Sequence, residues 1–233
     1  MNIGFIGTGH ITSSVIEGIL KSKLKVNKIY ISPRNRIIAK KLSKKFKKVN
    51  ISKHNQQLIN VSDWVFLAVT PPVGEDILKH LYFKKNKQII SFISTTDINT
   101  IKQYTTNTNV TRVLPLPFIG IKKGPIIICP PNKKIKNFFK QLGKTIEIKN
   151  EEVSKNFWTT SSFMAPFYEM LAVKSNWLVS KGVKRKEAED YVRELFLALS
   201  QDAINKKNIS LKQLVSESQT PGGINAQALR ELK

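Results

Sequence analysis

The chain has 233 residues, 41% of them hydrophobic and 24% charged, which is typical of a globular protein with a substantial core. No run approaches the roughly 18 apolar residues of a membrane span, and the first residues lack the pattern of a signal peptide. The net charge of +23 is spread along the chain without a nucleic-acid-binding motif, so specific nucleic-acid binding is not expected. The single cysteine, Cys129, cannot form an internal disulfide, which favours a reduced, cytoplasmic setting.

Residues 2–20 predict a buried strand, a glycine turn and an amphipathic helix in immediate succession. Gly7 allows the sharp turn, Gly9 lets backbone approach a pyrophosphate, and the helix start points free N–H groups at that charge. The alternative is a glycine turn that binds nothing. Thr12 stands where this motif usually has a third glycine, and a β-branched residue there would displace the helix slightly outward. The candidate cofactor-binding residues of this turn are Gly7, Thr8, Gly9, His10 and Ile11.

The second strand, over residues 28–32, indicates which dinucleotide is bound. NAD-preferring folds carry an acidic residue at the end of this strand, whereas here the sequence continues Ser-Pro-Arg-Asn-Arg. Ser32, Arg34 and Asn35 offer a hydroxyl, a forked cation and an amide to a 2′-phosphate. The sequence therefore favours NADP(H), unless Arg34 is only a solvent-facing residue at a helix start.

Strands and helices then alternate to about residue 148, which predicts a doubly wound parallel sheet of the Rossmann type. Ligands of such sheets lie beyond the carboxyl ends of the strands, so Val69, Thr70 and Pro71 are expected to border the cofactor, as is the stretch 94–96. The further strands are predicted over residues 49–51, 63–69, 88–93, 109–114, 125–129 and 145–148, and the helices over 37–46, 73–81 and 135–142.

From Glu151 onward only helical patterns remain, over residues 151–181 with an interruption near Pro166, 185–205, 211–217 and 225–232. This change predicts two domains, an NADP-binding Rossmann domain over 1–150 and an all-α domain over 151–233. So few helices cannot bury one another's apolar faces, so we expect a homodimer formed through them. The large apolar residues concerned include Trp158, Phe163, Phe167, Trp177 and Leu178.

The segment 218–225 (SQTPGGIN) precedes the last helix. Two glycines after a proline expose backbone N–H groups at a helix start, which suits a carboxylate, although an ordinary loop and helix cap is the alternative.

Several stretches together resemble the pyrroline-5-carboxylate reductase family: IGFIGTGHI at the start, ISPRN after the second strand, WVFLAVTPP, RVLP at 112–115, the helical second half and TPGG near the end. The resemblance implies that NADPH binds the N-terminal domain and that hydride passes to the C=N carbon of a cyclic imino acid, giving proline. It further implies that Gly222 and Gly223 hold the substrate carboxylate at a dimer interface. Thr220 would face the substrate, and Asn225 occupies the place of a threonine that hydrogen-bonds the imine nitrogen.

The departures from the family pattern lie on the substrate side. Leu116 and Phe118 stand where the family has a polar pair beside the nicotinamide, and the tail after Gly223 is shorter. The first hypothesis is an NADPH-dependent reductase of pyrroline-5-carboxylate or a related imino acid. The alternatives are a non-catalytic, regulatory NADP-binding dimer and a reductase of another imine or carbonyl substrate. Ser218, Thr220, Tyr168 and water are candidate proton donors, and the three histidines lack the spacing of a metal site.

Overall fold

The computed structural model describes residues 1–85, 87–106 and 109–232. It consists of two compact units, Met1–Ser161 and Ser162–Lys233. Helix α7 (Glu151–Ser161) belongs to the first unit, so the units divide later in the chain than the change in pattern at residue 150.

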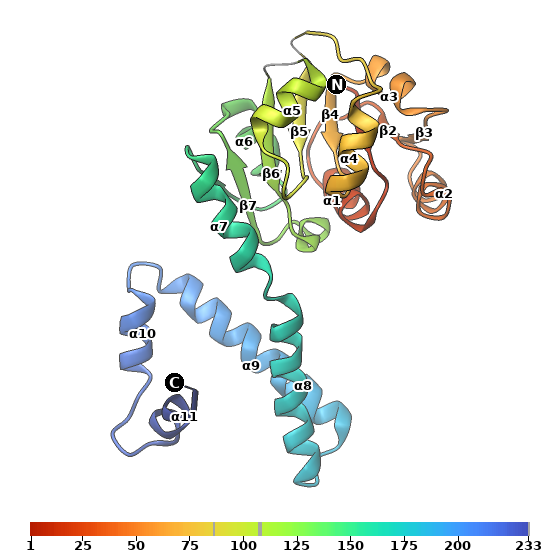
Figure 1. The fold of residues 1–233 in the computed structure, drawn as a ribbon. Helices are drawn as coiled ribbons and strands as arrows, with labels where there is room; N and C mark the ends of the chain where they lie inside the picture. The colour runs from red at the N-terminus through yellow and green to blue at the C-terminus, as the bar shows by residue number, and fades with distance from the viewer. Residues whose placement is uncertain (86, 107–108, 233) are drawn as a thin grey trace. The chain divides into compact units, whose positions relative to one another are not determined.

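The first unit contains one eight-stranded sheet in the order β3-β2-β1-β4-β5-β6-β7-β8 (Figure 1). The order reverses between β1 and β4, which is the switch point where such sheets bind ligands. The strands are β1 (Ile3–Ile6), β2 (Ile29–Ile31), β3 (Val49–Ile51), β4 (Trp64–Leu67), β5 (Gln88–Ser91), β6 (Val110–Leu114), β7 (Pro125–Cys129) and β8 (Lys144–Glu147).

The Rossmann-type sheet expected from the sequence is confirmed, with one correction to its strand directions. Strands β1 to β6 are parallel, but β7 runs antiparallel to β6, and β8 is parallel to β7. Only residues 115–124 join β6 to β7, and they contain the 3₁₀-helix η1 (Pro117–Ile121). A parallel crossover needs about a dozen residues or more, usually with an α-helix, so this short connection reverses the chain.

Helices cover both faces of the sheet, because alternate strand residues point to opposite sides. Phe5 packs with α1 (His10–Leu20), α2 (Arg36–Lys45) and α6 (Lys133–Phe139) in one buried cluster. Ile6 packs on the other face with α3 (Asn55–Val61), α4 (Pro71–Leu78) and α5 (Ile98–Thr105). The sequence patterns did not predict α3 and α5, although Asp97 caps α5 as a typical N-cap residue does.

The second unit consists of α8 (Met164–Ser180), α9 (Arg185–Asn205), α10 (Leu211–Glu217) and α11 (Ile224–Leu232). The long helical pattern over 151–181 breaks before Pro166, which stands in the first turn of α8, where its missing N–H costs nothing. Among the described residues of this unit, the buried hydrophobic ones are Ala188 and Val192, both on α9. Trp177 is 61% exposed and Ile204 is 65% exposed. This unit therefore leaves most of its large apolar side chains uncovered by its own helices.

Among the described residues, no helix is long and apolar enough to cross a membrane. The same residues contain no group of three or more His, Cys, Asp or Glu side chains arranged to hold a metal ion.

Candidate functional site

The turn between β1 and α1 is built around a close approach of backbone. Gly7 has φ +101°, and a Cβ there would lie 2.3 Å from the carbonyl oxygen of Ala68, at the end of β4. Any other residue would combine an unfavourable positive φ with a clash against the Ala68 carbonyl, so glycine is required. A Cβ built on Gly9 meets no atom within 4 Å, so the space above the turn is open to a ligand.

Two threonine hydroxyls hold this turn in place. Thr8 Oγ1 donates to the carbonyl of Ser32 at 2.7 Å, which ties the turn to the end of β2. Thr12 Oγ1 donates to the carbonyl of Gly7 at 2.8 Å, and its side chain is fully buried. Thr12 is therefore accommodated at the helix start, with its hydroxyl bonded to the turn, and the outward displacement of the helix stays a prediction. The close helix contact instead involves Gly18, where a Cβ would lie 2.3 Å from the carbonyl oxygen of Ile119.

The start of α1 has the properties of an anion-binding site. Gly9 is its N-cap, no side chain caps it, and its first turn carries no acidic residue. The first amides of a helix lack intrahelical acceptors, so these N–H groups and the helix dipole favour a phosphate. His10 is exposed at the first position of the helix and Ile11 is half-buried. The turn thus fits the pyrophosphate of a dinucleotide on its own geometry.

The end of β2 carries the residues predicted for a 2′-phosphate. Ser32 is buried, and its N–H donates to the carbonyl of Phe5 at 3.0 Å. Arg34 is exposed and has no hydrogen-bond partner among the described residues. Asn35 caps α2, its Oδ1 accepting from the N–H of Ile38 at 3.2 Å. The oxygen of this amide therefore serves the helix, and only its NH₂ group is left to donate to a phosphate.

The end of β4 completes this edge of the sheet. Val69 is half-buried, Thr70 is the N-cap of α4, and Pro71 is its first residue, where a proline is favoured. Because Gly7 abuts Ala68, the cofactor-binding candidates after β1 and β4 lie beside each other at the switch point. All eleven predicted cofactor residues belong to the turns that follow β1, β2 and β4 or to the helix starts there.

A hollow of about 390 Å³ opens beside this edge, between the starts of α4 and α5. Glu75 receives hydrogen bonds from Lys79 at 3.0 Å and from the Tyr104 hydroxyl at 2.9 Å, which lower the pKa of its carboxyl. The N–H of Thr100 lowers the pKa of Asp97 in the same way. The sequence indicated Thr95 and Thr96 at this edge, but it missed the side of the hollow formed by α5, because that helix was not recognised. Its lining residues are Pro71, Pro72, Glu75, Thr95, Thr96, Asp97, Thr100 and Tyr104.

Arg112 in β6 is the largest fully buried side chain of the protein. Its Nη1 lies 2.7 Å from Oε1 of Glu151, and its Nη2 donates to the carbonyls of Ile93 and Ser94, at the exit from β5. The guanidinium carbon lies 4.6 Å from the centre of the Trp158 ring. The sequence contained a signal for this pair, because Arg112 is a lone charge within an apolar strand. Arginine is rarely buried unless it is paired, so the pattern indicates a partner for Arg112.

The TPGG segment forms a tight turn in the second unit. The N–H of Gly223 donates to the carbonyl of Thr220 at 2.8 Å, and Gly222 has φ +74°. Proline followed by a glycine of positive φ is the arrangement of a type II turn. Nδ2 of Asn225 donates to the carbonyl of Ser218 at 3.1 Å. These substrate-site candidates are therefore close together along one exposed turn, and their contact with a substrate stays a prediction.

Two further candidates for the substrate side have different surroundings. The Ser218 hydroxyl donates to the carbonyl of Leu214 at 2.7 Å, so it is engaged within its own helix. Ser218 and Asn225 nevertheless line an apolar hollow of about 370 Å³. Tyr168 is 52% exposed on α8. In the first unit, Leu116 and Phe118 are both half-buried at the start of η1.

Comparison with known proteins agrees with this geometry. A family described as "NADP oxidoreductase coenzyme F420-dependent" matches residues 2–96. The pyrroline-5-carboxylate reductase of Staphylococcus epidermidis is 25% identical over 243 residues, covering 100% of this chain and 89% of that protein. The Plasmodium falciparum pyrroline carboxylate reductase, solved with NADP bound, superimposes with a TM-score of 0.83 at 21% identity, covering 100% of this chain and 89% of that one.

A more distant likeness is to a reductive aminase of Aspergillus terreus solved with NADPH and ethyl levulinate. Its TM-score is 0.65 at 13% identity, covering 94% of this chain and 80% of that one, which shows a common fold. The full-length sequence match, the glycine turn and the eight-stranded sheet agree with the resemblance expected from the motifs. Over its whole length the chain is thus similar to pyrroline-5-carboxylate reductases at about 25% identity, and its residues 2–96 match a family of NADP oxidoreductases.

Proposed function

We propose that this protein is an NADPH-dependent reductase that transfers hydride to the C=N bond of a small cyclic imino acid, with 1-pyrroline-5-carboxylate as the substrate and proline as the product. The observation that carries the proposal is the β1–α1 turn, whose uncapped helix start and obligatory Gly7 fit a pyrophosphate. Relatives that match this chain over its whole length, and of which it covers about nine-tenths, are named as pyrroline-5-carboxylate reductases.

NADP(H) is the cofactor in this proposal. The pyrophosphate would lie on the first amides of α1, with Gly7, Thr8 and Gly9 beneath it. The 2′-phosphate would be held by Arg34, with donors from Ser32 and Asn35. Arg34 supports this assignment because its guanidinium has no partner among the described residues and no carboxylate follows β2 to repel a phosphate.

The reaction asks for orientation and a dry site more than for a nucleophile, because a protonated imine is already electrophilic. When bound, NADPH would supply the hydride that adds to the imine carbon, and a proton source would keep the nitrogen protonated, so the products would be the cyclic amine and NADP⁺. In the proposal, the turn at Gly222 and Gly223 holds the substrate carboxylate, with the Gly222 amide as donor, because the Gly223 amide already donates to the carbonyl of Thr220. Asn225 hydrogen-bonds the ring nitrogen, and the hydroxyl of Thr220 faces the reacting centre.

The active form in this proposal is a homodimer joined through the C-terminal helices. The exposed apolar side chains of the second unit support it, since Trp177 and Ile204 lie open to solvent in the single chain. Residues 1–150 would bind the cofactor, and 151–233 would supply the dimer contacts and the substrate turn. Cys129 is free and buried, which agrees with a reduced, cytoplasmic protein.

A second candidate is a reductase of a more apolar imine or carbonyl compound, or a regulatory dimer that binds NADP without turnover. Leu116 and Phe118 favour it, because neither side chain offers a hydrogen bond at the end of β6. The retained TPGG turn favours the imino acid, since a cofactor sensor has no need to hold a carboxylate.

The test is the oxidation of NADPH at 340 nm with pyrroline-5-carboxylate, compared with NADH and with a control lacking substrate. Turnover of about one per second or more with NADPH supports the proposal. Tight binding of NADPH without turnover contradicts the imino-acid assignment. A panel of cyclic imines without a carboxylate then tests the second candidate.

A further inference from the structure

The buried Arg112 and its partner Glu151 are not needed to explain the cofactor or substrate contacts described above. We propose that these two residues form a positioning pair that fixes the loop between β5 and α5 against the nicotinamide half of the bound cofactor. This inference rests on the proposed function, because it concerns the orientation of the cofactor in that reaction.

The guanidinium of Arg112 holds the beginning of the loop. Nη2 donates to the carbonyl of Ile93 at 3.3 Å and to that of Ser94, the second and third residues after the end of β5. Nη1 is engaged with Glu151, and the Trp158 ring covers the guanidinium plane. A lysine at 112 would keep the charge, but its single ammonium could not reproduce the planar fork or the stacking.

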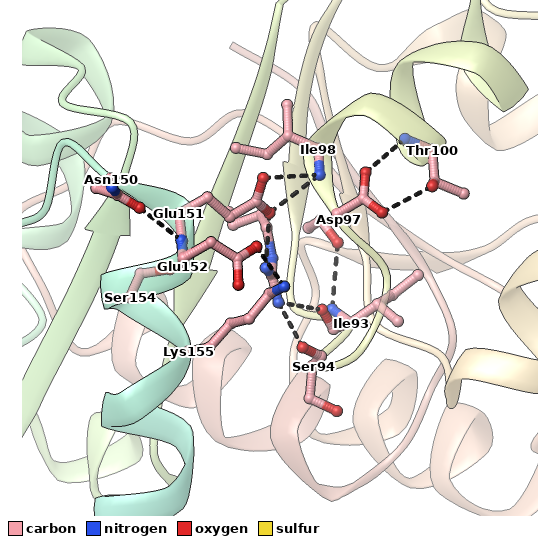
Figure 2. Close-up of polar contacts among 12 residues, drawn as sticks. Ile93, Ser94, Asp97, Ile98, Thr100, Asn150, Glu151, Glu152, Ser154 and Lys155 are labelled. Carbon is pink, nitrogen blue, oxygen red and sulfur yellow. Dashed lines mark hydrogen bonds and ion pairs between the residues drawn. The ribbon is translucent and has the colours of Figure 1, made fainter.

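The carboxylate of Glu151 holds the end of the same loop. Its two oxygens accept from the N–H of Ile98 at 3.0 and 3.3 Å, at the first residue of α5. Figure 2 shows Glu151 beside Ile98, with Asp97 turned toward Thr100 on the other side of the helix start. One ion pair therefore fixes both the exit from β5 and the start of α5, and the intervening residues 94–97 are held between these two points.

The position of the loop in the sheet indicates which part of the cofactor it meets. The 2′-phosphate candidates follow β2, on one side of β1, whereas β4 and β5 lie on the other side of β1. A dinucleotide whose pyrophosphate lies on the β1 turn therefore extends its nicotinamide half toward β4 and β5. Thr95 and Thr96 line the hollow at this edge. The pair is thus expected to govern cofactor orientation more than cofactor affinity.

The experiment compares Arg112→Lys and Glu151→Gln with wild type, and uses Arg193→Lys as a matched control. Arg193 is an exposed residue of α9 that pairs with Glu189 and Asp190. In Arg112→Lys, kcat is expected to fall about ten-fold or more, because small misplacement of reacting groups is costly. The Kd of NADPH is expected to change less than about three-fold, since the phosphate contacts are intact. In Glu151→Gln, kcat is also expected to fall more than NADPH affinity, but by a smaller factor, because the amide oxygen still accepts hydrogen bonds.

Hydrogen–deuterium exchange gives a readout that does not depend on turnover. Peptides covering residues 93–98 are expected to exchange faster in both variants, whereas peptides of α1 are expected to be unchanged. Unchanged kcat with unchanged exchange in this segment would overturn the proposal, and so would an equal loss of affinity and kcat in both variants. If Arg112→Lys does not fold, Glu151→Gln decides. A wild type without turnover counts against the proposed function instead, and the exchange of 93–98 still tests the positioning pair.

Discussion

The two units of this chain differ in how far they bury their apolar side chains. In the first unit, the strands β1, β4 and β5 are almost wholly buried between helices on both faces of the sheet. In the second, α10 has no buried residue, and α8 buries only Ser175. Burial of apolar area is the main favourable term in folding, so the first unit contains its own core. The second unit leaves most of its large apolar side chains exposed, and this exposure is the basis of the proposed dimer.

A substitution at Gly7 is expected to have the largest effect on the first unit. Gly7→Val combines a positive φ with a Cβ 2.3 Å from the Ala68 carbonyl, so we expect NADPH binding to be lost. The free energy of unfolding of the first unit should fall by about 3 kcal/mol. Gly9→Ala is the matched control, because its Cβ meets open space. It should leave stability unchanged and weaken only cofactor binding. Calorimetric titration measures NADPH affinity and thermal melting measures stability. A Gly7→Val protein that binds NADPH normally would contradict the assignment of the turn.

Trp177→Glu tests the second unit. Trp177 is 61% exposed on α8, and a central aromatic residue of an interface is worth about 2–4 kcal/mol, so the Kd of the dimer should rise roughly 30- to 1,000-fold. Light scattering after size-exclusion chromatography measures the change. Ile37→Glu is the control, since Ile37 is 83% exposed on α2 of the first unit and should leave assembly unaltered. Equal masses for Trp177→Glu and wild type at all concentrations would refute the proposed interface.

Arg34→Ala sharpens the cofactor assignment of the first unit. Loss of a hydrogen bond to a charged group costs about 1.5–3 kcal/mol, so the Kd of NADPH should rise about 10- to 100-fold. The Kd of NADH should stay as in wild type, because NADH lacks the 2′-phosphate. Fluorescence titration with the two cofactors measures the ratio. If NADPH affinity is unchanged, Arg34 is only a surface residue.

Gly223→Val examines the turn of the second unit. A Cβ at Gly223 would lie 3.0 Å from the carbonyl oxygen of Thr220, so the turn must shift. The KM for the imino acid should rise about ten-fold, which corresponds to about 1.4 kcal/mol, while the Kd of NADPH is retained. Steady-state kinetics at varied imino-acid concentration measures this KM. An unaltered KM would contradict the proposal that this turn binds the substrate carboxylate.

Asp97→Ala should have the smallest effect, a loss of about 1 kcal/mol in the stability of the first unit. The Thr100 amide lowers the pKa of Asp97 in the folded state, so its stabilisation is present above the unfolded pKa and is lost as pH falls through the folded one. The variant should therefore lose less stability than wild type on acidification. Asp202→Ala, in an exposed pair with Lys206, serves as the control. If the free energy of unfolding falls equally on acidification in wild type and Asp97→Ala, Asp97 makes no such contribution.

The sequence predicted the parts of the fold that depend on local patterns. The expected ranges of β3, α9 and α10 coincide with the observed ones, because periodicity and flanking residues specify such elements without distant contacts. Helices α3 and α5, of seven and eight residues, were missed, although Asp97 is a recognisable N-cap. The reversal of β7 was also missed, because a short connection can be recognised only once its two strands are known to pair.

In the candidate site, the glycine turn, the lack of an acid after the second strand and the TPGG turn could be predicted from the sequence, because each depends on residue types a few positions apart. The hydrogen bond from Thr12 to Gly7 and the close contact of Gly18 with Ile119 could be seen only in the folded structure. It also decided that Arg112 meets Glu151, residues that lie on β6 and α7 and are brought together by folding. Such a pair cannot be read from spacing, because burial removes both charges from water only when the strands and helices that carry them have assembled.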